Sequence, residues 1–256
     1  MDISIITVTW NSEKHIAEQI RSVISACSGI SFEQIVVDNG SGDGTIEIIE
    51  KNFPSVKFIK NNHNAGFGIA NNQAVKMALG EYVLFLNPDM RLTDGSLAIW
   101  LKWMGERPKV GISGCRLVTE DGGLNLEAMP RRFPLVWDQL LVILKIPHVF
   151  PSVLNHYLYR DKDFSKEQNV DSLRGSCMLV RHELIEKLGY AFDPRYYIWF
   201  EDVDLCREAK RLGFEVAYTP IVSATDAVGK SFKKRNVFWK QFQLIQSMLK
   251  YFWKWK

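Results

Sequence analysis

The first 115 residues alternate short apolar, β-branched runs with segments in which apolar residues recur at helical spacing. The strand-like runs cover 3–9, 35–37, 56–59, 82–86 and 110–115. Strands that alternate with helices build βαβ units around a parallel sheet. We therefore predict an α/β fold with a mainly parallel central sheet flanked by helices. Ligands of such sheets bind beyond the carboxyl ends of the strands, so polar functional groups are expected there.

Helices are predicted between these strands from the spacing of apolar residues. Asn11 or Ser12 is expected to cap the first of them, because both side chains can accept hydrogen bonds from a free helix terminus. The predicted helices cover 16–27, 45–49, 69–79 and 96–104.

The composition excludes several classes of protein. The 256 residues are 46 % hydrophobic and 24 % charged, which is typical of an ordered globular protein with a sizeable core. With 32 basic and 29 acidic residues the net charge is +3, which is too small to indicate a nucleic-acid partner. The four cysteines form no CxxC pair, so we expect buried free thiols in a reducing compartment rather than disulfides or zinc.

No secretory signal or membrane span is predicted. The first strand begins directly after Met1-Asp2, without a basic start or a cleavage site. The most apolar stretch, 135–144, is interrupted by Asp138 and Gln139 and is too short to cross a bilayer. We expect a cytoplasmic protein that is soluble or peripheral at the inner face of the cell membrane.

Polar sequences follow two of the predicted strands in the middle of this half. Asp38 opens the Gly-rich segment 38–45, where it could be a turn residue or could accept hydrogen bonds from a nucleotide base or ribose. The segment 61–68 ends in Gly66-Phe67-Gly68, but Asn71 stands where a dinucleotide fingerprint needs its third glycine. It also follows the wrong strand, so a Rossmann dehydrogenase is not expected.

The strand 82–86 ends at Asn87-Pro88-Asp89. Alone, this tripeptide is equally consistent with a Pro turn and with a site for Mg²⁺ or Mn²⁺, which bind few carboxylates together with substrate phosphates. Its position in an ordered series of polar strand ends favours the metal site.

Four motifs, in this order, resemble those of glycosyltransferase family 2. They are Thr9-Trp10-Asn11, Val37-Asp38-Asn39-Gly40-Ser41, Asn64-x-Gly66-Phe67-Gly68-x-x-Asn71-Asn72 and Phe85-Leu86-Asn87-Pro88-Asp89. The resemblance runs from about residue 3 to about residue 231 and is closest to the rhamnosyltransferase-like branch of bacterial surface-polysaccharide synthesis. It implies a GT-A fold, a nucleotide-sugar donor, a divalent cation and inversion at the anomeric carbon.

The resemblance also implies roles for single residues. Asp38 is expected to contact the base, and Asp89 to bind the Mg²⁺ or Mn²⁺ that bridges the donor phosphates. Because Asn87 replaces the first carboxylate of the commoner Asp-x-Asp form, we expect weak metal binding until the diphosphate arrives. The expected donor-binding residues are Thr9, Asn11, Asp38, Asn39, Asn64, Gly66, Phe67, Gly68, Asn71 and Asn87.

A helix that begins near residue 201 carries three carboxylates, Glu201, Asp202 and Asp204, in its first turn. A helix N-terminus favours negative charge, so an acidic first turn is ordinary. It follows the aromatic run 196–200, however, and a partly desolvated carboxylate can act as a base. The Glu-Asp pair matches the family's catalytic motif, which makes Asp202 the expected base and Glu201 the residue expected to orient the acceptor.

Other residues of the second half are expected to bind the acceptor or the metal. Similar segments in the family shape the acceptor pocket, so Arg174, Gly175, Ser176, Trp199 and Glu201 are the expected acceptor-binding residues. A tight turn beside the sheet explains Gly175 and Ser176 equally well.

Relatives often carry His-x-x-Gly-x-Ser after the acidic helix, whereas this chain has Asp226-Ala227-Val228-Gly229-Lys230-Ser231. An aspartate can ligate the same ions through oxygen, so Asp226 could keep the metal role or the role could be lost.

Two segments join basic residues to apolar helical periodicity. The first is 131–144, which begins with Arg131-Arg132. The second is the tail, where Trp239, Phe242, Ile245, Met248 or Leu249, and Phe252 recur at helical spacing beside Lys233, Lys234, Arg235, Lys240, Lys250, Trp253, Lys254, Trp255 and Lys256. Such helices often lie on anionic membranes. The alternatives are packing on the domain or a dimer face.

We expect one domain with three parts. They are a nucleotide-sugar-binding half over 1–115, an acceptor-binding and catalytic half over 116–231 and a basic amphipathic C-terminal helix over 232–256. The predicted function is inverting transfer of a sugar, with rhamnose as the first guess, from dTDP-rhamnose or a UDP-sugar to a saccharide acceptor linked to polyprenyl diphosphate. The alternatives are a non-catalytic carbohydrate-binding or scaffold protein and a sugar-1-phosphate nucleotidyltransferase. The latter would carry a Gly-rich basic loop after its first strand, which 9–14 is not.

Overall fold

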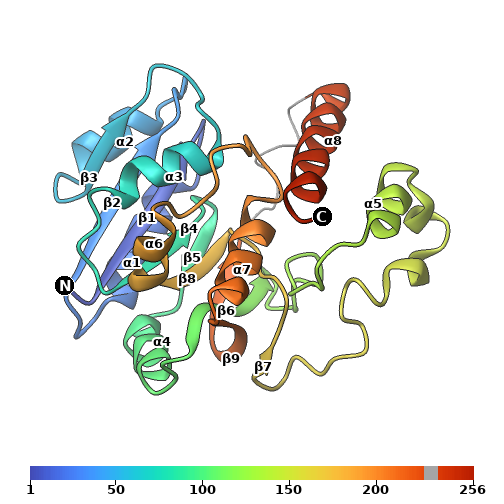
Figure 1. Cartoon of the computed structure of the whole chain (residues 1–256). Coiled ribbons are helices and arrows are strands. Elements are labelled where there is room, and N and C mark those ends of the chain that lie inside the picture. The colour runs from blue at the N-terminus through green and yellow to red at the C-terminus, as the bar shows by residue number, and fades with distance from the viewer. Residues whose placement is uncertain (228–235) are drawn as a thin grey trace.

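A computed structural model describes residues 1–227 and 236–256 of the chain (Figure 1). Its centre is one nine-stranded sheet in the order β3-β2-β1-β4-β8-β6-β9-β5, with β7 beside β9. The strands are β1 (Ile3–Thr9), β2 (Phe32–Asp38), β3 (Lys57–Lys60), β4 (Tyr82–Leu86), β5 (Met90–Leu92), β6 (Val110–Thr119), β7 (Gln168–Asn169), β8 (Cys177–Arg181) and β9 (Glu215–Asp226).

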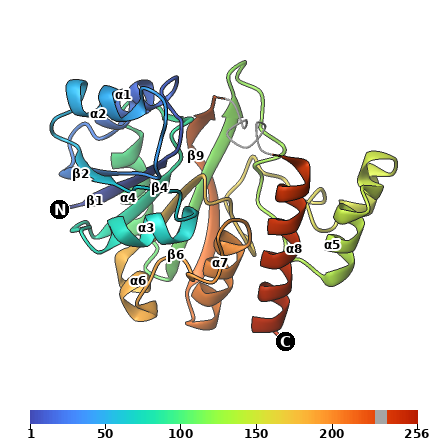
Figure 2. The ribbon, with the colours of Figure 1, turned by 90° about the horizontal axis from the view of Figure 1, so that it is seen from above.

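Helices cover both faces of this sheet. One face packs against α1 (Ile16–Ala26), α2 (Thr45–Asn52) and α4 (Ser96–Gly105). The other packs against α3 (Phe67–Val75), α6 (His182–Leu188) and α7 (Glu201–Arg211), as Figure 2 shows from above. The predicted α/β architecture is confirmed, because the apolar runs of the strands are buried between these two layers.

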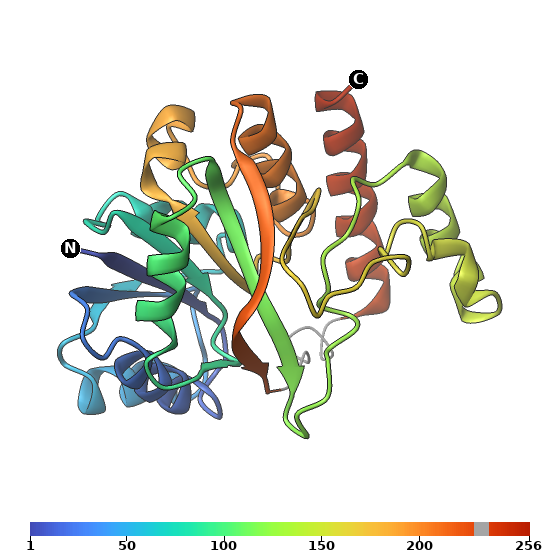
Figure 3. The same ribbon diagram turned by 90° about the horizontal axis from the view of Figure 1, so that it is seen from below.

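The sheet is parallel only in part. Strands β3, β2, β1 and β4 are parallel, as predicted from the helices that connect them. Strand β8 enters antiparallel between β4 and β6, and β6 then pairs in parallel with β9, seen in green and orange in Figure 3. Strands β5 and β7 are antiparallel to β9. The sheet is therefore mixed, since β8 arrives from the excursion 120–176 rather than from a crossover helix.

The predicted cap of the first helix is wrong. Helix α1 begins at Ile16, and no side chain caps it. The side chain of Asn11 instead accepts a hydrogen bond from Gly42 N at 2.8 Å, and only the carbonyl of Ser12 meets the helix, through Ile16 N at 3.0 Å. Helix α3 also differs from its prediction, since it begins at Phe67 and ends at Val75.

The excursion 120–176 forms a lobe with little regular structure. It contains α5 (Val136–Ile143) and two short 3₁₀ turns, η1 (Ile146–His148) and η2 (Pro151–Leu154). Among the helices of the described chain, none combines the length and the apolar character needed to cross a membrane. All four cysteines are buried and free, as predicted.

The C-terminal helix α8 (Val237–Lys254) packs on the domain beside α7 and touches α5 (Figure 2). Its buried residues Met248 and Tyr251 meet Tyr196 and Phe200. The apolar residues of this helix thus divide into an inner set, which packs on the domain, and an outer set. The outer set contains Phe238, Phe242, Ile245, Leu249 and Trp253, all exposed.

Two of the tail's predicted interfacial residues face the protein. Lys254 Nζ lies 3.0 Å from Asp193, 2.7 Å from Asp204 and 2.9 Å from Glu208. Trp255 Nε1 donates to Asp204 at 2.7 Å. Lys254 and Trp255 therefore anchor the helix rather than face solvent. The residues Lys233, Lys234 and Arg235 lie outside the described residues.

Candidate active site

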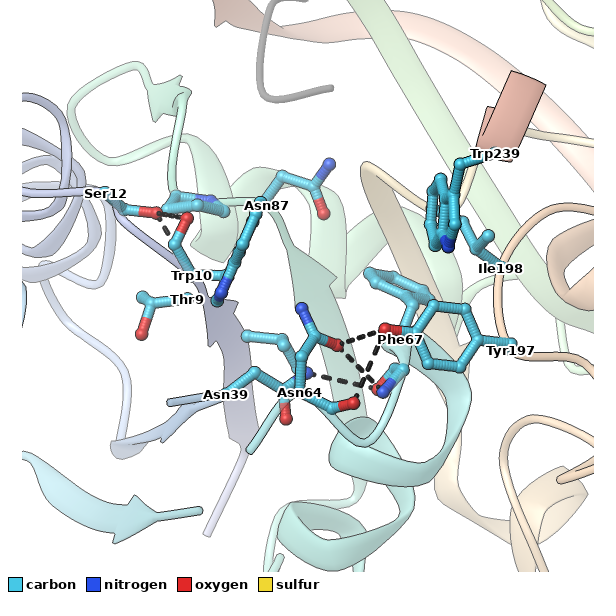
Figure 4. A pocket seen from close by; sticks show the side chains of 13 residues that line it. Thr9, Trp10, Ser12, Asn39, Asn64, Phe67, Asn87, Tyr197, Ile198 and Trp239 are labelled. Carbon is cyan, nitrogen blue, oxygen red and sulfur yellow. Dashed lines mark hydrogen bonds between the residues drawn. The ribbon is translucent and has the colours of Figure 1, made fainter. Parts of the chain in front are cut away.

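Two cavities lie at the carboxyl ends of the central strands. The first cavity brings together six of the predicted donor-binding residues, Thr9, Asn39, Asn64, Gly66, Phe67 and Asn87 (Figure 4). Its remaining lining residues are Val8, Trp10, Ser12, Pro88, Tyr197, Ile198 and Trp239. The β1, β2 and β4 ends thus converge as a parallel sheet requires.

Four predicted donor residues lie outside the lining of the first cavity. Asp38 is fully buried, and its carboxylate accepts from Thr9 Oγ1 at 3.0 Å and from Ser41 N at 2.8 Å. Asn71 is also buried and donates to the carbonyl of Phe67 at 2.9 Å. Gly68 packs against Phe192, and Asn11 is exposed, with its side chain bonded to Gly42 N as described above. Without a bound ligand, these residues contact and support the segments that line the first cavity.

Gly66 is required for the two halves of the chain to meet. Its φ is +92°, and a Cβ at this position would lie 2.7 Å from the carbonyl oxygen of Tyr197. That oxygen accepts a hydrogen bond from Phe67 N at 2.9 Å. Tyr197 Oη in turn donates to Asn64 Oδ1 at 2.9 Å. A segment of the second half therefore closes the first cavity.

Aromatic side chains form much of the wall of the first cavity, and most of them were not predicted as site residues. Trp239 of α8 meets Tyr197 edge to face, with ring centroids 5.9 Å apart (Figure 4). Trp10 lies across the cavity from them. Trp10 belongs to a quoted motif, whereas Tyr197 lay in an aromatic run and Trp239 in the tail stripe. Only the folded chain brings the three together.

The two predicted metal ligands lie close together in the fold, Asp89 in the turn immediately before β5 and Asp226 at the end of β9. Asp89 is 6 % exposed, and its carbonyl oxygen accepts from Ala227 N at 2.9 Å, while Met90 pairs with Asp226. The carboxylate of Asp226 accepts from Asn125 at 2.9 Å. Within 1–227 and 236–256 no three His, Cys, Asp or Glu side chains gather around one point. Two carboxylates completed by substrate phosphates are a donor set that Mg²⁺ takes, so these residues fit such an ion. Gly229, Lys230 and Ser231 lie outside the described residues.

The second cavity contains the predicted base. It is lined by Met129, Arg131, Gln139, Val142, Tyr157, Ser172, Leu173, Arg174, Trp199, Phe200, Asp202, Val203 and Leu244. Asp202 accepts hydrogen bonds from Gly175 N at 3.1 Å and from Val203 N at 2.8 Å. Arg174 and Trp199, predicted to bind the acceptor, lie in the same lining. The carbonyl of Ser176 accepts from Asn87 N at 2.9 Å, which joins the loop 172–176 to the predicted metal motif Asn87-Pro88-Asp89.

Glu201 lies in a different environment from Asp202. It is 6 % exposed, lines neither cavity, and its Oε2 has no hydrogen-bond partner among the described residues. Burial, with the nearby charges of Asp202 and Asp204, holds the pKa of Glu201 well above its usual range. The geometry therefore favours a protonated Glu201 and leaves Asp202 as the carboxylate that faces a cavity.

The backbone before α7 is strained. Trp199 and Phe200 have φ values of 63° and 69°, which side chains other than glycine rarely adopt. Such conformations persist where the surroundings enforce them, and they cluster at functional sites. Here the two strained residues both line the second cavity, immediately before the acidic first turn of α7.

Comparison with known proteins gives the family. The model of glycosyl transferase family 2 matches residues 4–189. The N-acetylglucosaminyl-diphospho-decaprenol L-rhamnosyltransferase of Mycobacterium tuberculosis (strain ATCC 25618 / H37Rv) is 28 % identical over 232 residues, 85 % of this chain and 73 % of that protein. The rhamnosyltransferase WbbL of Escherichia coli (strain K12) is 28 % identical over 166 residues, 62 % of this chain and 60 % of that protein.

Solved structures show the same GT-A fold. TarS of S. aureus (residues 1–349) in complex with UDP has a TM-score of 0.62 at 21 % identity and covers 96 % of this chain. The mannosyltransferase PcManGT of Pyrobaculum calidifontis, with GDP-Man and Mn²⁺, has a TM-score of 0.64 at 20 % identity and covers 98 %. The match spans 64 % of each of those chains, slightly under two thirds. These structures give the fold, and the family model, which matches most of the length, shows that the chain belongs to glycosyl transferase family 2.

Proposed function

We propose that this glycosyltransferase moves a sugar, with inversion, from a nucleoside-diphosphate donor to a hydroxyl of a polyprenyl-diphosphate-linked saccharide. The observation that carries the proposal is the Asp202 carboxylate in the second cavity, held by Gly175 N beside a loop that also binds the metal motif. Rhamnose from dTDP-rhamnose is the proposed sugar, supported by the names of the two relatives, and a UDP-sugar is the alternative donor.

The mechanism follows from the division between the two cavities. The first cavity binds the donor through its polar rim and aromatic walls, and the acceptor hydroxyl approaches from the second. Asp202 takes the proton of that hydroxyl as its oxygen attacks the anomeric carbon and the bond to the diphosphate breaks. A Mg²⁺ or Mn²⁺ ion held by Asp89 and Asp226 would neutralise charge on the departing diphosphate. No covalent enzyme intermediate is needed, so one base suffices.

The substitution Asp202→Asn tests this assignment. We expect kcat to fall by about 10²–10⁴-fold, the usual contribution of a general base. The Kd of the nucleotide should stay unchanged, because Asp202 does not line the first cavity. The exposed Asp163→Asn serves as the matched control. Wild-type turnover in Asp202→Asn, measured with a panel of nucleotide sugars, would refute the role. Release of pyrophosphate from a nucleoside triphosphate and a sugar 1-phosphate would instead favour a nucleotidyltransferase.

We also propose that the protein lies on the inner face of the cell membrane through α5 and α8. Exposed apolar side chains support this proposal, including Phe238 at 81 %, Trp253 at 68 % and Trp137 at 75 % exposure. Helices α5 and α8, which carry these side chains, contact each other, so the proposed membrane face spans both helices (Figure 2). A lipid surface that covers such a face would bring a lipid-linked acceptor to the second cavity.

A further inference from the structure

The second cavity carries more positive charge than a proposed base requires. Arg131 and Arg174 line it together with Asp202, in a volume of about 280 Å³. The side-chain amide of Gln139, a residue only 5 % exposed, belongs to the same lining. Asp202 contributes the lining's one carboxylate, and that carboxylate already accepts two backbone hydrogen bonds.

The two guanidinium groups share one neutral acceptor. Arg131 Nη2 and Arg174 Nη2 both donate to the carbonyl oxygen of Glu127, at 2.9 and 2.6 Å. Neither arginine forms an ion pair within the part of the chain that the structure describes, and 228–235 contain no acidic residue. Three buried nitrogens, Arg131 Nε, Arg174 Nε and Gln139 Nε2, have no hydrogen-bond partner among the described residues.

This arrangement of two arginines and a glutamine destabilises the folded chain when no ligand is bound. Buried donors without acceptors lose their bonds to water, and two like charges at one carbonyl repel each other. Burial, and secondly Arg131, lower the pKa of Arg174 to about 10. Arg132, in contrast, has a charged acceptor, because its Nη1 and Nη2 donate to Asp161 at 3.0 and 2.7 Å. An oxyanion in the second cavity would give the two guanidinium groups an acceptor of opposite charge and offset their mutual repulsion, since guanidinium groups bind phosphates in planar, bidentate geometry.

Apart from Tyr157 and Ser172, the rest of the lining of the second cavity is apolar. Val142 comes from α5 and Leu244 from α8, the two helices with exposed apolar side chains. Met129, Leu173 and Trp199 complete this side. A ligand that fits both parts carries a phosphate group joined to a hydrocarbon chain. A free sugar or a free nucleotide would leave the apolar side without contacts.

We propose that Arg131, Arg174 and Gln139 bind the phosphate or diphosphate of a prenyl-linked acceptor, whose chain lies against α5 and α8. The proposal rests on the proposed function, because it identifies the group by which that acceptor is held. Asp202 lies in the same cavity, so the first sugar beyond the diphosphate reaches the base directly. Arg174 is also close in sequence to Ser176, which binds Asn87 of the metal motif, so the test must separate this role from binding of the donor diphosphate.

Farnesyl diphosphate, inorganic pyrophosphate and UDP are the probes, titrated calorimetrically against the whole chain without a nucleotide sugar. Farnesyl diphosphate should bind more tightly than pyrophosphate. Arg131→Gln and Arg174→Gln should each weaken it by at least about 10-fold, the value of one charged hydrogen bond. Gln139→Leu should weaken it several-fold. Arg160→Gln removes an exposed arginine that does not line the cavity and should change nothing.

Two results would overturn the proposal. One is weaker UDP binding in the arginine variants with farnesyl diphosphate unaffected, which would assign the arginines to the donor. The other is equal affinity for farnesyl diphosphate and pyrophosphate, or binding of neither, which would exclude a prenyl-linked ligand of the second cavity. Thermal unfolding shows whether each variant is folded. If Arg131→Gln or Arg174→Gln does not fold, Gln139→Leu and Arg131→Lys are used in its place. Binding here requires no transfer, so an enzyme that binds farnesyl diphosphate but transfers no sugar would contradict the proposed function alone.

Discussion

The substitution Lys254→Met tests how strongly α8 is fixed to α7 and to the loop that carries Asp193. Lys254 is 13 % exposed, and its three carboxylate partners, Asp193, Asp204 and Glu208, are 8, 1 and 6 % exposed. Solvent screening is therefore small. Removal of one partner from a buried ion pair costs about 3–5 kcal/mol, because the remaining charges stay buried. We expect a loss of this size, which corresponds to a Tm lower by about 6–20 °C for a chain of this length.

The loss should depend on pH. Burial raises the pKa values of Asp193 and Glu208, but hydrogen bonds outweigh it and hold both below their usual range; Asp193 accepts from Arg195 and Lys254, and Glu208 from Lys254 and Arg211. A lowered folded-state pKa contributes stability that is present above the unfolded value, near 4, and is lost as the pH falls through the folded value. The variant lacks this contribution. The difference in Tm between wild type and Lys254→Met should thus be largest at pH 7–8 and shrink towards pH 4.

Differential scanning calorimetry at several pH values measures both effects. Lys250→Met is the matched control, since the exposed Lys250 donates, among the described residues, only to the carbonyl oxygen of Arg195, at 2.7 Å. Its substitution should cost less than about 1 kcal/mol at any pH. Equal Tm values for Lys254→Met and Lys250→Met at pH 7.5 would refute the reasoning.

Three further predictions concern the cavities and the outer face of α8. Gly66→Ala should lower both Tm and donor affinity, because its Cβ would overlap the Tyr197 carbonyl at a positive φ; an unchanged Kd for UDP would contradict this. Glu201→Gln should match the wild-type Tm at pH 4 and exceed it at pH 8, because a raised folded-state pKa costs stability as the pH rises above the unfolded value. A lower Tm at pH 8 would show that the charged form is needed. Phe238→Ser with Trp253→Ser should abolish sedimentation with anionic vesicles at unchanged Tm; no lipid association of the wild type would count against a membrane face.

The strand ends were predictable because their signals are local. Buried runs such as 3–9 and 82–86 identify strands by themselves, and each is followed directly by its polar group. Strand β9 was not predicted, and it contains Pro220, a residue that is unusual inside a strand. In the structure its pairing with β6 is interrupted between Tyr218 and Ser223, so the proline lies where no ladder partner is required.

Long-range contacts could not be predicted. Nothing near Trp239 in sequence indicates Tyr197, and the arginine pair of the second cavity joins positions 131 and 174 through the carbonyl of Glu127. The apolar period of α8 is the same whether its partner is a protein or a bilayer. Only the division into an inner and an outer face, fixed by the packing of Met248 and Tyr251, separates the two.

The insertion of β8 between β4 and β6 has a consequence for how the chain folds during its synthesis. Strand β8 covers the free edge of β4, with Arg181 paired to Tyr82. That edge therefore stays unpaired until the 99 residues that follow Tyr82 have been made. An apolar strand with open hydrogen-bonding groups is a template for pairing with other chains. We infer that a nascent chain that has not yet reached Arg181 depends on chaperones. We also infer that the complete chain folds slowly relative to helical proteins of similar size.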